Sequence, residues 1–364
     1  MQTEEKQTRV INHKTMRKIV GSIAILMPIA VVVVSERPEA ELSSISVSYW
    51  TDSHDIFVGS LIAVAFFLVA YNGTGACRRD AEFWLSKAAC IFAILVALFP
   101  TTPFDEHAER PPDWIMVISE RFFLEPKEIH NIAAILFFTC LILLMSFFSL
   151  RAKNKRELSR SRFYFGISLG MLVGLPIVYC FGKLSRCYEP IFWLEFVGLW
   201  LFGWGWLVAG SYKNKPEEEA PAGATKLKEI EVDPSNPDVP TNINAEVGAQ
   251  YFFKAEGCWG DWFMECGPHG WGPNWNPFAG KNRIKWRPFF LLCGNVGKKE
   301  DHAFCIGDRY TWTVPSTVYD LKRGDRKLYL FANDWKSRYQ NNRALKPEEG
   351  GPLKVTIYRL KSDK

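Results

Sequence analysis

The sequence predicts two regions of different fold class, an α-helical six-span transmembrane bundle and an all-β sandwich domain that follows it. Three observations carry this prediction: six apolar runs before residue 212, a change to charged and proline-containing composition after Tyr212, and short strand-like runs from Thr225 onward. A chain of 364 residues also exceeds the length at which a single hydrophobic core stops growing. The expected domains are a basic tail at 1–18, the transmembrane region at 19–211, a flexible linker at 212–224 and the β domain at 225–364.

The six apolar stretches are extendable by flanking residues toward the roughly 20 residues that cross a bilayer. Open strands would leave backbone N–H and C=O groups unpaired in lipid, so helices are expected. The first stretch is followed by Ser35-Glu36-Arg37-Pro38 and not by a small-residue cleavage site, which predicts a retained helix. The stretches are 19–34, 56–71, 86–100, 130–150, 163–181 and 190–211.

Lysine and arginine are unevenly divided between the two sets of loops that six spans would create. One set, with both termini and the basic loop at 151–162, holds 16 of them, and the other set holds 6. The positive-inside rule therefore places both termini in the cytoplasm, in what we interpret as a bacterial inner membrane. The modest net charge of +5 lies in these short loops and does not favour nucleic acid as a partner.

Several ionisable residues lie at the ends of the apolar stretches on the predicted outer side. Glu195 falls inside Phe-Trp-Leu-Glu-Phe, where burial of a carboxylate is costly unless it is paired. The sequence therefore suggests a membrane polar cluster of His54, Asp55, His130 and Glu195. The alternative is that polar residues at helix ends simply meet headgroups and water.

After the linker, six short runs with strand composition recur between turn signals, which favours a β-sandwich. Between the last two runs lies Ala-Asn-Asp-Trp-Lys-Ser-Arg-Tyr-Gln-Asn-Asn at 332–342. Ca²⁺ takes six to eight oxygen ligands, and this segment offers Asp334, Asn341 and Asn342. Taken alone, such an Asx-rich loop is better explained by turns that satisfy their own backbone.

Several motifs of the β domain resemble, in the same order, the galactose-binding bacterial lectin family of the lectin A (PA-IL) type. They are Phe-Phe-Lys-Ala-Glu-Gly-Cys-Trp (252–259), Cys-Gly-Pro-His-Gly (266–270), Leu-Leu-Cys-Gly-Asn-Val-Gly (291–297), Phe-Cys-Ile-Gly (304–307) and Leu-Phe-Ala-Asn-Asp with Asn-Asn beyond it. The resemblance covers about 225–362 and implies a Ca²⁺ ion that binds the vicinal hydroxyls of a galactose-like carbohydrate.

Carried over to this sequence, the resemblance implies a set of calcium ligands and of sugar-binding residues. The sequence departs from the family after the paired asparagines, where 343–349 intervene before Gly350-Gly351, and in 269–287, where the sugar-gripping loop has no clear counterpart. The implied metal ligands are the side chains of Asp334, Asn341 and Asn342 and the backbone carbonyls of Arg338 and Trp262. The implied sugar-binding residues are Asp334, Asn341, Trp262, Trp271, Trp275 and His269.

The transmembrane region resembles a bacterial family of uncharacterised multi-helix membrane proteins of the Frag/DRAM/Sfk type. The segments that carry the resemblance are 44–51, 55–59, 96–101, 129–134 and 192–195. This resemblance implies a fold and no reaction.

The cysteines of the β domain leave two interpretations open. Cys258, Cys266, Cys293 and Cys305 could form two disulfides, but a cytoplasmic location would keep them as thiols. Cys266-Gly-Pro-His269 resembles half of a zinc site for which no second half has the usual spacing.

The sequence thus predicts a membrane-anchored, calcium-dependent carbohydrate-binding protein without enzymatic activity in its β domain, because no catalytic triad, phosphate loop or paired acid/base motif is present. The alternative is a membrane-intrinsic transporter or lipid-active protein, with the β domain as a regulatory or assembly module. The lipid bilayer is the second expected partner, and homo-oligomerisation stays open. A cytoplasmic β domain would be deprived of abundant calcium, which conflicts with the first interpretation.

Overall fold

The computed structural model describes residues 13–35, 42–73, 77, 79–103, 111–185, 189–212, 220–272 and 276–361. The chain divides into two compact units. The helical unit comprises 1–71 and 84–214, and the β unit comprises 215–364 together with the short segment 72–83. This segment was not expected in the β unit, because it connects two of the apolar stretches in the sequence.

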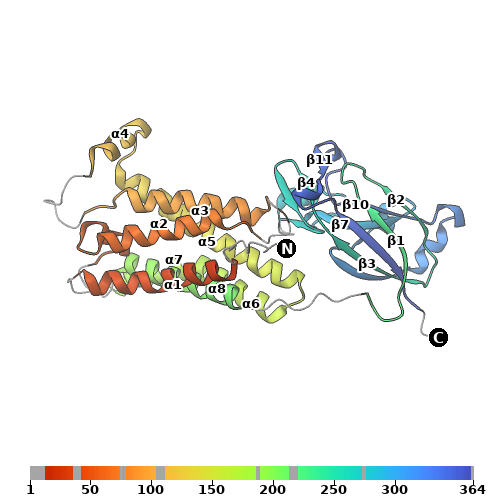
Figure 1. Cartoon of the computed structure of the whole chain (residues 1–364), viewed down its shortest axis with the longest axis horizontal. Helices are drawn as coiled ribbons and strands as arrows, with labels where there is room; N and C mark the ends of the chain where they lie inside the picture. Colours follow the sequence, from red (N-terminus) through yellow and green to blue (C-terminus); the bar gives the residue numbers. More distant parts are fainter. Residues whose placement is uncertain are drawn as a thin grey trace, which may run out of the picture. The chain divides into compact units, whose positions relative to one another are not determined.

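All six apolar stretches form helices (Figure 1). Five of the helical segments are long and apolar enough to cross a membrane, whereas α2, at 17 residues, is a shorter apolar helix. The span predicted at 56–71 is therefore not among these five segments. The helices are α1 (His13–Val34), α2 (His54–Ala70), α3 (Ala81–Leu98), α4 (Asp113–Phe122), α5 (Pro126–Asn154), α6 (Leu158–Leu169), α7 (Leu175–Ser185) and α8 (Pro190–Ser211).

Helices α6 and α7 form one continuous apolar segment, joined by a π-helical turn at Gly170–Gly174. Pro176 lies just after this turn and has no N–H to donate to the residue four positions earlier. A widened turn at a proline is the usual way in which a helix absorbs the missing bond. A short 3₁₀ helix, η2 (Ile45–Trp50), precedes α2.

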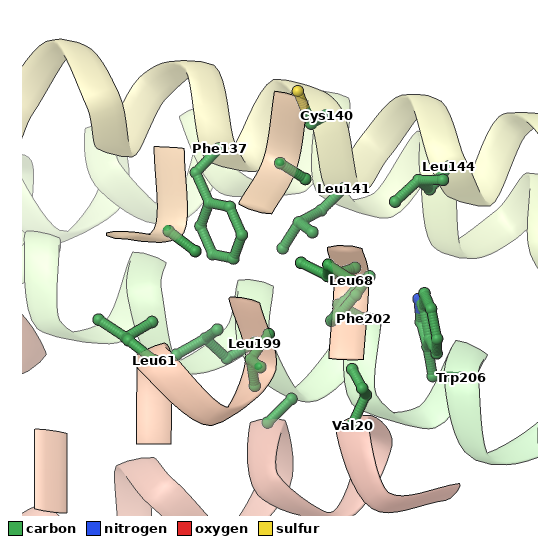
Figure 2. Close-up of a cluster of buried hydrophobic side chains, with 14 of the residues drawn as sticks. Val20, Leu61, Leu68, Phe137, Cys140, Leu141, Leu144, Leu199, Phe202 and Trp206 are labelled. Atoms are coloured by element: carbon green, nitrogen blue, oxygen red, sulfur yellow. The ribbon is translucent and has the colours of Figure 1, made fainter. Parts of the chain in front are cut away.

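The core of the helical unit is a continuous cluster of buried apolar side chains from α1, α2, α3, α5, α6 and α8. Figure 2 labels ten of them: Val20, Leu61, Leu68, Phe137, Cys140, Leu141, Leu144, Leu199, Phe202 and Trp206. Small residues bring α1 and α8 together, because a Cβ added to Gly203 would lie only 2.9 Å from the carbonyl oxygen of Gly21. Such close backbone approach is the main source of helix association where lipid surrounds the helices.

The β unit contains three antiparallel sheets, with strand orders β1-β12-β3-β9, β2-β10-β7-β6 with β8 also on β7, and β11-β4-β5. All six strand-like runs of the sequence are strands, namely β1, β3, β7, β9, β10 and β12. The strands are β1 (Thr225–Glu231), β2 (Val239–Asn244), β3 (Gln250–Glu256), β4 (Trp259–Asp261), β5 (Met264–Cys266), β6 (His269–Trp271), β7 (Phe289–Val296), β8 (Phe304–Cys305), β9 (Arg309–Thr313), β10 (Lys327–Ala332), β11 (Asn342–Ala344) and β12 (Lys354–Arg359).

Apolar side chains from the two larger sheets meet in one core. Phe253 of β3 and Ile357 of β12 belong to the same buried cluster as Leu292 of β7 and Leu330 of β10. Strand β7 is buried along its whole length, as expected of a central strand covered on both faces. This packing fixes the end of β10, from which the loop at 333–341 departs.

Segment 72–83 is bound to the smallest sheet of the β unit. Cys77 forms a disulfide with Cys258, which directly precedes β4. The backbone N–H and carbonyl oxygen of Arg79 both bond to Glu265 of β5, each at 3.0 Å. The segment therefore belongs structurally to the β unit even though the chain runs from it into α3.

Candidate functional site

The residues after β10 that the sequence singled out meet a second segment at the end of β4. Asn342 lies opposite Asp261 where β11 pairs with β4. The side-chain nitrogen of Asn341 donates to Asp261 Oδ1 at 3.0 Å. The loop at 333–341 is thereby joined to the β4–β5 turn.

Asp334 is 4% exposed and only one of its carboxylate oxygens is satisfied. Oδ1 accepts the backbone N–H of Trp335 at 2.7 Å. Oδ2 is fully buried and has no hydrogen-bond partner among the described residues. A buried carboxylate oxygen without a partner is costly and uncommon in a folded protein.

Asn342 presents a second oxygen of the same kind. Its side chain is 6% exposed, and its nitrogen donates to the carbonyl oxygen of Pro234 at 3.0 Å. This bond fixes the orientation of the amide and leaves Oδ1 buried without a partner within the described part of the chain. The side chain of Asn342 also interacts with that of Asp334, which opposes the effect of burial on the pKa of Asp334. A buried oxygen acceptor without a partner is an atom that a bound cation would satisfy.

Asp261 is a site residue that the sequence reasoning did not find. Its Oδ2 accepts the indole N–H of Trp271 at 3.1 Å, in addition to the bond from Asn341 to Oδ1. Burial, and then the negative charge of Asp334, raise the pKa of Asp261 to about 6. Burial also raises the pKa of Asp334. Two partly desolvated carboxylates that repel each other make this region favourable for positive charge.

The two residues expected to supply backbone carbonyls both lie next to Asn341. Arg338 precedes the 3₁₀ turn η8 (Tyr339–Asn341), and its carbonyl oxygen accepts the N–H of Asn341 at 3.3 Å. Trp262 has a positive φ of 52° in the β4–β5 turn, and its N–H donates to the Asn341 carbonyl oxygen at 3.4 Å. In these two bonds the acceptors are the carbonyl oxygens of Arg338 and Asn341, and Trp262 takes part only through its N–H.

The expected sugar-binding aromatic residues have different environments. Trp262 is 74% exposed and its ring meets that of Phe263 edge-on at 4.9 Å. Trp271 is partly buried, and its ring stacks on Phe289 at 5.1 Å. Trp275 lies outside the described residues. Trp262 therefore offers the more accessible aromatic surface of the two that are described.

His269 lies two residues before Trp271 on β6 and is paired with a carboxylate. Its Nε2 is 3.2 Å from Oδ1 of Asp308, and this interaction, with burial opposing it, lowers the pKa of Asp308. Cys266, the other member of the proposed half zinc site, is buried in β5. No group of three His, Cys, Asp or Glu side chains suited to a metal ion occurs among the described residues.

In the helical unit, Glu195 binds the start of η2. Its Oε2 accepts the N–H groups of Ile45 and Ser46 at 2.6 and 3.2 Å, and its Oε1 accepts the Ser46 hydroxyl at 2.6 Å. A carboxylate that caps the N-terminus of a helical turn satisfies N–H groups that lack intrahelical partners. Glu195 thus has a structural explanation.

The other members of the expected membrane polar cluster bind elsewhere. His130 Nδ1 lies 2.7 Å from the carbonyl oxygen of Phe99, and His54 Nδ1 lies 2.6 Å from that of Tyr49. Asp55 is exposed in the first turn of α2. Each of these side chains therefore has its own local role at a helix end, and their described contacts do not join them into one site.

No known protein-family model matches this chain, and no curated protein matches it at a significant level. The interpretation of the site therefore depends on its geometry and chemistry.

Proposed function

We propose that this chain is a membrane-anchored, calcium-dependent carbohydrate-binding protein whose β unit is a lectin-like sandwich. The observation that carries the proposal is the pair of buried, unsatisfied oxygens, Asp334 Oδ2 and Asn342 Oδ1, beside the carboxylate of Asp261. Oxygen-only donor sets of carboxylates and amides are typical of Ca²⁺, whereas zinc prefers sulfur and nitrogen.

Asn341 extends this donor set. Because its side-chain nitrogen donates to Asp261, its side-chain oxygen, on the other arm of the planar amide, is not used in this bond and can act as a ligand. The carbonyl oxygen of Arg338, in the turn between Asp334 and Asn341, can contribute another donor. A Ca²⁺ ion in this position would neutralise the repulsion between Asp261 and Asp334 and would still have room for ligands from outside the protein.

A carbohydrate suits the remaining positions around such an ion. Vicinal hydroxyl groups are neutral oxygen ligands, and the C–H face of a sugar ring packs on an aromatic surface. The exposed ring of Trp262 directly follows Asp261 and can provide that surface. A galactose-like sugar is the proposed ligand, following the family resemblance.

The membrane arrangement in this proposal is six spans, with α2 as the sixth, and the β unit on the non-cytoplasmic side. Four segments of spanning length and composition, α3, α5, α6–α7 and α8, separate Cys77 from Cys258. An even number of crossings puts the two cysteines on the same side, as their disulfide requires. Disulfides persist in oxidising compartments, where millimolar calcium and external sugars are also available.

This orientation is opposite to the one predicted from Lys and Arg counts. A charge count is a statistical preference, whereas a disulfide between segments 181 residues apart is a covalent bond that cytoplasmic thiols reduce. We therefore give the disulfide more weight. A membrane-intrinsic activity is not proposed, because the described contacts of Glu195 and His130 are structural.

The test of function is binding of the full-length, detergent-solubilised protein to immobilised galactose. Retention is expected with 5–10 mM calcium, a concentration on the order of tenfold above the dissociation constants of extracellular calcium modules. Addition of a chelator should abolish retention. Asp334→Ala should not bind, and Asp320→Asn, which alters an exposed carboxylate elsewhere in the β unit, should bind like the wild type. If the protein binds calcium but is retained on no sugar resin, carbohydrate is rejected as the ligand and only the calcium site is supported.

A further inference from the structure

Two cysteines lie opposite each other on neighbouring strands of the β unit. Cys293 of β7 pairs with Cys305 of β8 in the antiparallel register. The N–H of Ile306 donates to the carbonyl oxygen of Leu292 at 2.9 Å, so the ladder hydrogen bonds flank the cysteine pair and do not join it. In such non-hydrogen-bonded pairs the Cα atoms are about 4.5 Å apart and the side chains approach most closely.

This separation falls within the roughly 4.4–6.8 Å between Cα atoms that a disulfide bridges. Both cysteines carry free thiols in the structure. The register of the two strands is therefore compatible with a bond between them. The register that buries β7 therefore also brings the two sulfur atoms together.

The two thiols differ in exposure and in acidity. Cys293 is fully buried, and burial holds its pKa well above the ordinary range. Cys305 is only partly buried, and the hydrogen bond from the Cys293 thiol, helped by the positive charge of Arg287 and opposed by burial, lowers its pKa to about 7. An accessible thiol of low pKa next to a buried second thiol is the pairing found at redox-active cysteines.

We propose that Cys293 and Cys305 form a redox site, a dithiol that reacts with a small-molecule or protein disulfide and closes to a second disulfide of the β unit. The alternative of a thiolate metal site lacks support, because no third Cys, His or carboxylate completes a ligand group among the described residues.

The exchange proceeds in two balanced steps. The Cys305 thiolate attacks one sulfur of the external disulfide, its S–S bond breaks, and one external thiolate leaves. Cys293 then gives up its proton to solvent or to the departing thiolate and attacks Sγ of Cys305. The second external thiol leaves, so one external disulfide is reduced to two thiols while Cys293 and Cys305 are oxidised.

Because β8 has two residues and pairs only with β7 among the described strands, the new bond would fasten this short strand covalently to the sheet. Ile306 and Gly307 follow directly and already bond to Leu292, so their position would be fixed as well. The expected structural effect is local to the segment around β8.

The test uses the full-length protein in detergent, first reduced and then incubated with oxidised glutathione. Remaining thiols are alkylated in denaturant, and tryptic peptides are analysed by mass spectrometry, since cleavage after Lys298 and Lys299 separates the two cysteines. The expected product is a peptide pair linked through Cys293 and Cys305. Cys266, which is equally buried but lies opposite Trp259, should stay a thiol.

Single variants separate the two roles. Cys293→Ser should accumulate one glutathione adduct on Cys305, whereas Cys305→Ser should leave Cys293 unmodified in the folded protein. In Cys293→Ser a hydroxyl replaces the thiol that hydrogen-bonds to Cys305 and changes the strength of this bond, so the pH dependence is measured on the wild type. There, initial modification should rise about tenfold from pH 6 to pH 8 and then level off, as expected for a thiol whose pKa is about 7.

Several outcomes would overturn the proposal. They are an absent linked peptide, pairing of either cysteine with Cys77 or Cys258, an unreactive Cys293→Ser variant, or modification of Cys305 that is no faster than that of Cys266. A rate that continues to increase steeply above pH 8 would show that the Cys305 thiol is not activated.

Discussion

Asn341 and Asp261 are 80 residues apart in the sequence and are joined by a hydrogen bond of 3.0 Å. The bond closes the loop after β10 over the end of β4, so that two carboxylates from distant segments, Asp261 and Asp334, share one partly desolvated region. The negative charge of Asp334 therefore influences the titration of Asp261, and the following expectations use this interaction.

Calcium should stabilise the folded β unit. With a dissociation constant on the order of 10⁻⁴ to 10⁻³ M, 10 mM calcium should contribute about 1.4 to 2.7 kcal/mol through mass action on the native state. Thermal unfolding of the full-length protein, followed by tryptophan fluorescence, measures this effect. Asp334→Ala should abolish the response, Asp320→Asn should keep it, and an unchanged wild-type transition at 10 mM calcium would argue against the site.

Removal of the Asp261 charge should affect the calcium-free and calcium-loaded proteins in opposite directions. Without calcium, Asp261→Asn relieves the repulsion from Asp334 but replaces one of the two oxygens that accept from Trp271 and Asn341, so it should stabilise the protein by no more than about 1 kcal/mol at pH 7. Addition of calcium should stabilise the variant less than it stabilises the wild type, because the negative charge of Asp261 beside the proposed ion is lost. Equal destabilisation under both conditions would indicate a purely structural role for this carboxylate.

Calcium binding should weaken as the pH falls through about 6, where Asp261 takes up a proton. Since the pKa of Asp261 is raised from 3.8 to about 6 in the folded protein, the calcium-free protein loses stability from this group as the pH rises between these two values, and the loss is complete above pH 6. Calcium competes with the proton, so its affinity should fall by up to about tenfold per pH unit below 6. Calorimetric titrations at pH 7.5, 6.5 and 5.5 test this, with Asp261→Asn expected to show a flatter profile.

The disulfide between Cys77 and Cys258 should hold the chain together after it is cut in the linker. A protease site introduced at 216–219 separates residue 77 from residue 258 on the polypeptide. After cleavage, the two fragments should migrate as one species without reductant and as two with it, and Cys77→Ser should give two under both conditions. The control is wild-type protein isolated with its thiols blocked. If it gives two fragments without reductant, the disulfide is absent and the orientation predicted from the Lys and Arg counts is favoured instead.

Glu195→Gln should destabilise the helical unit by about 1–2 kcal/mol, because a charged acceptor of three hydrogen bonds becomes a neutral one. Glu189→Gln, at the start of the same helix and without a side-chain capping bond, serves as the control. Thermal unfolding in detergent compares the two variants. Full stability of Glu195→Gln together with a lost cellular phenotype would instead favour the functional role that the sequence suggested.

The sequence was sufficient for the long elements and insufficient for the short ones. Strands such as β3 and β12 contain enough apolar residues to be recognised, and the apolar stretches predicted the helices other than α4, which was not expected. Strands β4, β5 and β11 have three residues each, too few for any periodicity, and their pairing is set by tertiary contacts.

The candidate site was predicted in part for the same reason. Asp334, Asn341 and Asn342 lie close together in one loop, so their spacing was visible in the sequence. Asp261 enters only through the pairing of β4 with β11, which no local pattern reveals. Its position directly before Trp262, already a candidate, was the one available signal. The binding of segment 72–83 to the β unit had no local signal at all, because Cys77 is a single cysteine between two apolar stretches.

The disulfide also orders events during synthesis of the chain. Cys77 is translated 181 residues before Cys258, and the four spanning-length segments α3, α5, α6–α7 and α8 are made between them. In the proposed six-span arrangement, the Cys77 thiol can therefore react with Cys258 only after all four segments have been inserted and the first strands of the β unit have been synthesised. A chain that had inserted one segment too few would present its two sulfur atoms to opposite sides of the membrane, and the bond would never form. In the proposed six-span arrangement, a bond between Cys77 and Cys258 would therefore report that the four segments between them had all been inserted.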